Sequence, residues 1–260
     1  DYNRQDVALM PKLDNLLNCT EHFINLQHIA QCDFKTTPWV TRLATVLFMR
    51  DKEFTQRIPS IPQHGFEKYT GADIQEPNPG VYENVAILDI RAMYHSNVNK
   101  ENISWETLMP DGSFDTSAPR GVLGRTMDTL TALRDTYKQR LKAADNPDEV
   151  RKWDAAQYAT KSLVASLYGV TGDSRYVMYH PAIAAAVTGE SRKTLGRLRR
   201  LCEEKGHRVI YGHTDSVFVE VDSPEEGKLL VSWLNEEMTP IVTEFEKFCE
   251  RVLLKAKNRY

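Results

Sequence analysis

The feature that most constrains the fold is a strand–turn–strand pattern near the C-terminal end of the chain. Two mostly apolar runs, residues 208–211 and 216–221, flank the turn Gly212-His213-Thr214-Asp215. Runs rich in β-branched and aromatic residues on both sides of a short turn that contains glycine are typical of a β-hairpin. The pattern therefore predicts a hairpin with Asp215 at its tip.

A second short strand is predicted at residues 85–88, where the apolar run Val-Ala-Ile-Leu ends in Asp89. If this strand and the hairpin share one sheet, Asp89 and Asp215 project from the same edge. Mg²⁺ takes oxygen ligands, commonly one or two carboxylates together with substrate phosphates. On spacing alone the pair is a weak signal, because an Asp in a turn is more often a cap or part of an Asx-turn.

Apolar residues at helical spacing predict several helices, separated by a Pro- and Gly-rich loop at residues 56–80. Asn146 and Pro147 form a start signal between two of them, so these two helices are expected to be an antiparallel pair. The expected helices cover residues 3–32 (with a kink or break at Pro11), 39–50, 121–144, 148–168, 180–205 (ending at Gly206) and 224–256.

The composition is that of an ordinary globular protein of 260 residues, with 41% hydrophobic and 27% charged residues. The formal net charge of -3 means that any nucleic-acid contact must rest on local basic groups. The four cysteines show no CxxC spacing, which predicts reduced, buried thiols. No apolar run reaches membrane-spanning length and no signal peptide is visible, so we expect no membrane partner and a cytoplasmic location, or a nuclear one in a eukaryotic host.

Three segments resemble, in order, the motifs of the family-B DNA polymerases. Residues 89–96 (DIRAMYHS) resemble the first palm motif, DxxSLYPS; residues 161–169 (KSLVASLYG) resemble the fingers motif KxxxNSxYG; residues 211–216 (YGHTDS) resemble the second palm motif, YGDTDS. Residues 102–107 (NISWET) and 257–260 (KNRY) are similar to two further stretches of the family, and Tyr2 and Asp6 to its last exonuclease motif. Such an ordered set is more specific than any one motif.

The resemblance implies an α+β fold: a palm with a central antiparallel sheet backed by helices, plus a fingers subdomain of two antiparallel helices. The implied divisions are a helical segment and linker at residues 1–75, the first part of the palm at 76–118, the fingers at 119–170, and the second part of the palm, up to the thumb border, at 171–260. Because residue 1 is Asp and no stop signal precedes residue 260, we expect a piece of a longer chain.

The function implied is template-directed DNA polymerisation, in which dNMP passes from dNTP to a primer 3′-OH through two metal ions. The implied ions are two Mg²⁺, with Mn²⁺ as a substitute, and the implied partners are primer–template DNA, dNTP and the exonuclease and thumb domains of the rest of the polymerase. The implied metal ligands are Asp89, the Ile90 carbonyl and Asp215; the nucleotide-binding residues are Tyr94, Arg134, Lys138 and Lys161; the template and primer contacts are Tyr168, Gly169, Thr214, Lys257, Arg259 and Tyr260.

Physical chemistry is consistent with these roles. Arg134 and Lys138 are four residues apart and share one helix face, and Lys161 lies on the partner helix. Lys and Arg side chains facing one cleft suit a triphosphate, although a solvated helix face is the alternative. The ring of Tyr94 suits a wall against a ribose 2′-OH, with a core tyrosine as the alternative.

Three departures from the family pattern leave a second function open. His213 replaces the first Asp of DTD, Ala165 replaces an Asn in the fingers motif, and His95 replaces a Pro after Tyr94. A histidine in place of a carboxylate lowers the negative charge available to metal ions. The alternative is a catalytically silent polymerase-like module that binds DNA or a partner.

Overall fold

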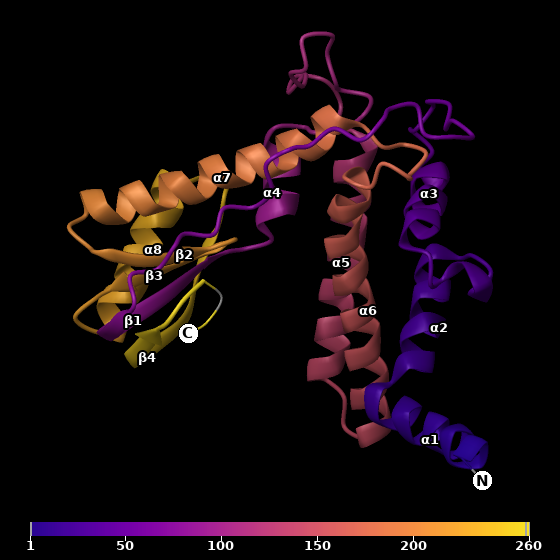
Figure 1. Cartoon of the computed structure of the whole chain (residues 1–260), viewed down its shortest axis with the longest axis horizontal. Helices are drawn as coiled ribbons and strands as arrows, with labels where there is room; N and C mark the ends of the chain where they lie inside the picture. Colours follow the sequence, from indigo (N-terminus) through magenta and orange to yellow (C-terminus); the bar gives the residue numbers. More distant parts are fainter. Residues whose placement is uncertain (1, 258, 260) are drawn as a thin grey trace. The chain divides into compact units, whose positions relative to one another are not determined.

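The computed structural model describes residues 2–257 and 259, which form two compact units (Figure 1). The first, here called the helical unit, comprises residues 1–66, 104–106 and 120–180. The second, here called the sheet unit, comprises residues 67–103, 107–119 and 181–260. The fingers segment expected at residues 119–170 falls almost wholly in the helical unit, and the expected palm segments fall mainly in the sheet unit.

The helical unit begins with two helices that meet at Asn18 and not at Pro11. Pro11 lies inside the first helix, whereas Asn18 takes a left-handed conformation with φ 56°. Asn tolerates this region better than most residues, so the chain turns there. The helices of this unit are α1 (Tyr2–Leu17), α2 (Cys19–Ala30), the 3₁₀ turn η1 (Phe34–Thr36), α3 (Val40–Arg50), α5 (Val122–Lys142) and α6 (Pro147–Thr171).

Helices α5 and α6 run side by side, as the sequence predicts (Figure 1). The side chain of Asn146 accepts a hydrogen bond from the Glu149 N–H at 2.9 Å, and Pro147 occupies the first turn of α6. The buried face of α6 includes Ala155, Ala156 and Ala159, whose small side chains allow close packing. Helix α6 also contacts α2 and α3.

The sheet unit contains a four-stranded antiparallel sheet in the order β2-β3-β1-β4. Strand β1 is therefore central and pairs with both β3 and β4. The elements of this unit are β1 (Gly80–Ile90), α4 (Met93–Lys100), α7 (Pro181–Glu204), β2 (Val209–His213), β3 (Ser216–Glu220), α8 (Pro224–Glu237) and β4 (Thr243–Leu254).

Side-chain alternation divides the two faces of the sheet. On one face Ala86, Leu88 and Ile90 of β1, with Val217 and Val219 of β3, pack against apolar residues of α7 and α8. Because Asp89 and Ser216 alternate with these residues, their side chains lie on the opposite face. The expected α+β class, an antiparallel sheet backed by helices, is thus confirmed.

The single long helix expected at residues 224–256 is wrong. Helix α8 ends at Glu237, Pro240 follows, and Thr243–Leu254 forms strand β4. The segment mixes charged and apolar residues at a spacing that fits either period, so its own pattern does not decide. Pairing with the long central strand β1 provides hydrogen-bond partners for the backbone of β4, so this segment forms a strand and not a helix.

None of the helices within residues 2–257 and 259 is both long and apolar enough to cross a membrane. All four cysteines are free; Cys202 is buried as expected, whereas Cys19 is exposed.

Two leucines of α8 that differ in burial can test whether this helix packs on the sheet as described. Leu234 is fully buried between α8 and the sheet, whereas Leu229 on the same helix is 71% exposed. Leu234→Ala should lower the free energy of unfolding by about 2–5 kcal/mol, because it leaves a cavity in a packed core. Leu229→Ala is the matched control and should change it by less than about 0.5 kcal/mol in urea unfolding. Equal effects would contradict this placement of α8.

Candidate active site

Strand pairing brings the two predicted carboxylates to one edge of the sheet. Asp89, near the end of β1, is paired with Ser216 at the start of β3 and with Glu244 on β4. The Ser216 hydroxyl donates a hydrogen bond to Asp89 Oδ1 at 2.8 Å. The Ile90 N–H donates to the Asp215 carbonyl at 2.8 Å. The structure thus joins residues that are far apart in sequence.

The hairpin turn is braced by the segment that precedes β1. Thr214 has a positive φ of 51°, and its N–H donates to the Asp73 carbonyl at 3.1 Å. The Gln75 N–H donates to the Gly212 carbonyl at 2.9 Å. These bonds fix the backbone of the turn immediately before Asp215.

Gly212 lies directly beside the guanidinium group of Arg199. A Cβ atom at position 212 would overlap that group, so a larger residue there would require the Arg199 side chain to move. Arg199 in turn forms an ion pair with Asp73 at 3.1 Å. The glycine of this motif therefore has a packing reason that the sequence alone does not reveal.

The site concentrates negative charge in a half-buried position. Burial raises the pKa of Asp89 to about 6, and the nearby Asp215, Glu246 and Glu244 carboxylates raise it too, against the hydrogen bond from Ser216. Burial also raises the pKa of Asp215, and Glu246 adds to this, while His213 opposes it. Both groups are thus harder to ionise than a free carboxyl. A bound cation would lower both pKa values, because it favours the ionised carboxylates.

The donor set fits hard divalent ions that retain water or phosphate ligands. Two carboxylates at one edge are the usual protein contribution to such a site. Among residues 2–257 and 259, no three His, Cys, Asp or Glu side chains gather into a closed metal-binding cluster. Glu244 and Glu246 were missed by sequence reasoning because their segment was expected to be helical.

Tyr94 lies in the first turn of α4, within the same unit as the carboxylates. Its side chain is half-buried and packs against the core between the sheet and α7. The pKa of its hydroxyl is raised first by burial, then by the nearby Asp215 and Tyr69. Tyr94 is therefore within electrostatic reach of Asp215, as a residue lining the same site requires.

The predicted phosphate-binding cations belong to the helical unit. Arg134 on α5 is half-buried, and its Nε is a buried donor with no hydrogen-bond partner among the described residues. Lys138 on α5 and Lys161 on α6 are exposed. Tyr168 and the exposed Gly169 lie in the last turn of α6.

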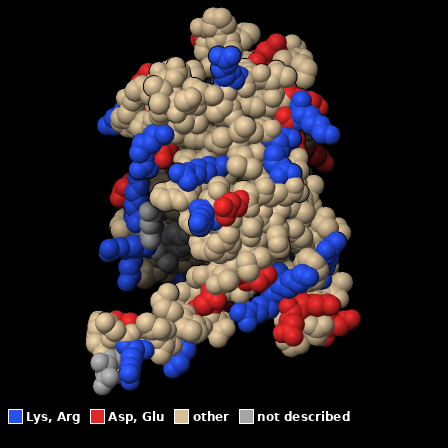
Figure 2. Space-filling view, turned by 90° about the vertical axis from the view of Figure 1, so that its right-hand side faces the viewer, with Lys and Arg blue, Asp and Glu red and all other residues tan. Residues whose placement is uncertain are grey.

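The predicted contacts at the C-terminal end lie just beyond β4. Lys257 and Arg259 are exposed, and the Arg259 N–H donates to the Ala256 carbonyl at 2.9 Å in a tight turn. Tyr260 lies outside the described residues. On the face shown in Figure 2, basic and acidic side chains both occur, and in several places they lie next to one another.

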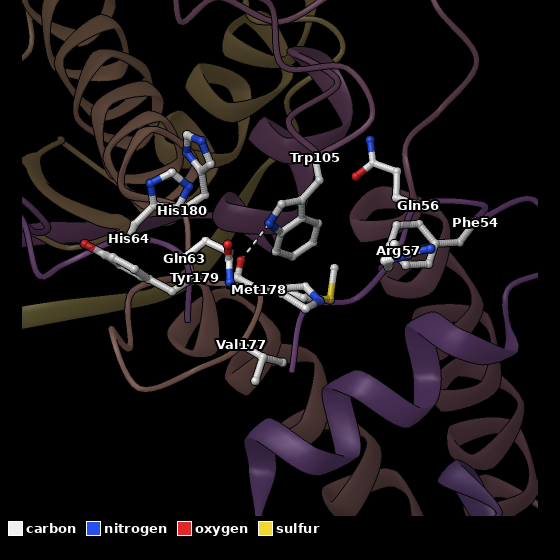
Figure 3. A pocket seen from close by; sticks show the side chains of 11 residues that line it. Phe54, Gln56, Arg57, Gln63, His64, Trp105, Val177, Met178, Tyr179 and His180 are labelled. Atoms are coloured by element: carbon white, nitrogen blue, oxygen red, sulfur yellow. Dashed lines mark hydrogen bonds between the residues drawn. The ribbon is translucent and has the colours of Figure 1, made fainter. Parts of the chain in front are cut away.

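A cavity of about 330 Å³ lies within the helical unit, where sequence reasoning placed no site (Figure 3). Phe54 and Trp105 line it, and the rings of His64 and His180 meet edge to face with centroids 4.4 Å apart. The Trp105 Nε1–H donates to the Met178 carbonyl at 2.7 Å. None of the predicted site residues lines this cavity, and its residues form no sequence motif that would have announced it.

Comparisons with known proteins agree with the resemblance carried by the motifs. The family model described as DNA polymerase family B matches residues 38–260. A DNA polymerase of Archaeoglobus fulgidus is 30% identical over 83% of this chain and 29% of its own length, and one of Paramecium bursaria Chlorella virus NY2A is 30% identical over 74% of this chain and 26% of its own length. The chain therefore spans less than a third of these relatives.

A solved structure gives the same result for the fold. The family B DNA polymerase of the hyperthermophilic archaeon Pyrobaculum calidifontis matches 95% of this chain and 35% of its own chain, with a TM-score of 0.70 and 27% sequence identity. The likeness thus extends over both units described above.

The raised pKa of Asp89 predicts a specific dependence of stability on pH. The folded state holds the Asp89 proton up to about pH 6, whereas the unfolded state releases it near 3.8. The folded state binds more protons between these values, so the free energy of unfolding should fall as pH rises through this window. Asp89→Asn removes this effect, and its melting temperature should exceed that of wild type more at pH 7 than at pH 4.

Mg²⁺ should narrow the difference at pH 7, because the ion favours the ionised carboxylates. Asp222→Asn, which alters an exposed carboxyl beyond the other end of β3, is the control and should retain the pH dependence of wild type. A constant difference between Asp89→Asn and wild type from pH 4 to pH 7 would contradict the assignment.

Proposed function

This chain belongs to family B of the DNA polymerases, and from that premise we propose that it forms the palm and fingers of a template-directed enzyme. The reaction proposed is transfer of dNMP from dNTP to a primer 3′-OH. The observation that carries the proposal is the meeting of Asp89 and Asp215 at one sheet edge, where burial and neighbouring carboxylates raise the pKa of Asp89.

Asp89, Asp215 and the Ile90 carbonyl would hold two Mg²⁺ ions, or Mn²⁺ in their place. When bound, such ions activate the attacking hydroxyl and stabilise the leaving pyrophosphate. The Ser216 hydroxyl binds one oxygen of Asp89 and orients that carboxylate. His213, close to Asp215, opposes the rise in the pKa of that carboxyl, but it supplies no carboxylate in place of the family's additional Asp.

Arg134, Lys138 and Lys161 would bind the triphosphate of the incoming nucleotide. The buried Nε of Arg134 supports this role, because a buried donor without a protein partner gains most from an anionic acceptor. Preorganised cations stabilise the charge that develops on the transferred phosphoryl group. Tyr94 would stack on the sugar and exclude a 2′-OH.

The remaining predicted residues would contact primer–template DNA. These are Tyr168, Gly169, Thr214, Lys257, Arg259 and Tyr260. Tyr supplies a flat stacking surface and Gly allows close backbone approach to a base pair. The exposed Lys257 and Arg259 suit contacts with backbone phosphates. The proposed further partners are the exonuclease and thumb domains of a complete polymerase, acting at the site of replication.

The second candidate function, a silent module that binds DNA or a protein partner, rests on His213, Ala165 and His95. His213 and Ala165 each replace a polar group that the family places near the metals or the nucleotide, and His95 replaces a proline that would stiffen the backbone after Tyr94. DNA binding without primer extension by the complete wild-type polymerase that contains this chain would favour this alternative.

Loss of Asp215 tests the proposed chemistry. Asp215→Asn should reduce single-turnover primer extension with Mg²⁺ and dNTP by about 10³-fold or more, because it removes a carboxylate from the metal site. The Asp222→Asn protein serves again as the matched control and should extend primers at the wild-type rate. Undiminished extension by Asp215→Asn would remove this residue from the metal site.

Loss of the Tyr94 ring tests sugar selection. Tyr94→Ala should increase rNTP incorporation relative to dNTP by about tenfold or more, because the wall against the 2′-OH is gone. Tyr158→Ala, at an exposed position on α6, is the control and should leave this ratio unchanged. The same ratio in Tyr94→Ala and wild type would exclude Tyr94 as the selecting residue.

A further inference from the structure

The helix that carries Tyr94 is too short to hold its own position. Helix α4 has eight residues, and it begins after Ala92, which has a left-handed conformation and makes no side-chain cap. Isolated helices of this length are marginal in water, because nucleation is unfavourable and few backbone bonds follow. The position of α4 must therefore come from its tertiary contacts, and its buried residues are Met93, Asn97 and Val98.

Asn97 is the polar member of this buried set and bridges α4 to α7. Its side chain is fully buried. Its amide Nδ2 donates to Ser191 Oγ at 3.2 Å, and its Oδ1 accepts from Thr194 Oγ1 at 2.8 Å. Ser191 and Thr194 are also buried, at 2% and 8% exposure.

The donors and acceptors of this bridge run in one direction only. Ser191 Oγ donates its proton to the Val187 carbonyl at 2.8 Å, so it accepts from Asn97. The amide nitrogen of Asn97 therefore faces Ser191, and its Oδ1 is left to accept from the Thr194 hydroxyl. The orientation of the Asn97 amide is thus set at the Ser191 end. A buried amide that loses such partners is left unsatisfied in the core, which penalises any shift of α4 along α7.

Tyr94 lies one helical turn before Asn97, so the two side chains share a face of α4. Tyr94 packs against a core to which α7 contributes Leu195 and Leu198. A rotation or slide of α4 would therefore move the Tyr94 ring and the Asn97 amide together. Apolar contacts tolerate small shifts of this kind, whereas a directional hydrogen-bonded pair does not.

We propose that Asn97 is a positioning residue which, through Ser191 and Thr194, sets the place of the Tyr94 ring and thereby the preference for deoxyribonucleotides over ribonucleotides. This inference rests on the proposed polymerase function. It assigns to the polar bridge between α4 and α7 a part in sugar selection that is separate from the metal site and from the fingers cations.

The test measures sugar discrimination, defined as kcat/KM for a dNTP divided by kcat/KM for the matching rNTP. Asn97→Leu keeps the size of the side chain and removes both hydrogen bonds; its discrimination should fall by about tenfold, because small misplacements of a positioned group have large effects. Thr194→Val removes one bond and should cause a smaller fall in the same direction. A general loss of folded protein lowers both kcat/KM values alike and leaves their ratio unchanged.

The matched control is Thr188→Val on the same helix. Thr188 is equally buried, but its hydroxyl donates only to the carbonyls of Ala184 and Ala185 within α7. Its variant should keep the wild-type discrimination. Hydrogen exchange gives an independent readout: the amides of α4 should exchange faster in Asn97→Leu than in Thr188→Val.

Unchanged discrimination in both Asn97→Leu and Thr194→Val, with the wild-type chain active, would overturn the inference. If Asn97→Leu fails to fold, Thr194→Val alone decides in the same way. Failure of the complete wild-type polymerase that contains this chain to extend a primer would instead overturn the proposed function, and the selectivity role with it. In that case the hydrogen-exchange comparison still supports or overturns the positional role of the bridge.

Discussion

The site depends first on the antiparallel register between β1 and β3. That register places Asp89 opposite Ser216, which begins β3 immediately after Asp215. A slip of one residue would turn the side chain of Asp89 toward the face that packs on α7 and α8, and would expose Leu88 in its place. The register is specified by burial, because Leu88 and Val217 must both face the helices. The same alternation of side chains along β1 and β3 therefore determines both the core and the site.

This arrangement gathers several carboxyl groups in a half-buried position, where the proposed metal ions would bind. A half-buried carboxyl with three acidic neighbours is harder to ionise than one in water, and the hydrogen bond from Ser216 offsets only part of the effect. Strand β4 contributes to this through Glu244 and Glu246, which lie beside the central strand and not on a helix. A bound divalent ion would balance this negative charge. Because the protein supplies few ligands, the ion would keep water or phosphate ligands as well.

The parts predicted from the sequence are those with strong local signals. The hairpin around Asp215, the strand ending near Asp89, and the Asn146–Pro147 start of α6 all combine turn or cap chemistry with a clear period. Strand β4 was missed because its mixed pattern fits both periods, and only pairing with β1 selects the strand. The contact between Gly212 and Arg199, and the bridge from Asn97 to α7, join distant segments, so no local pattern announces them.

Two different devices therefore hold the residues proposed for catalysis. The carboxylates are placed by backbone pairing, which is rigid because every slip changes the face of every side chain. Tyr94 is placed by a short helix that has no strong cap and depends on what it packs against. Burial of Met93 and Val98 holds α4 against the core, but apolar contacts do not fix its rotation or its position along α7. The buried amide of Asn97 supplies that direction, because its donor and acceptor cannot exchange places on α7. Under this proposal a buried polar group determines the precision of the site.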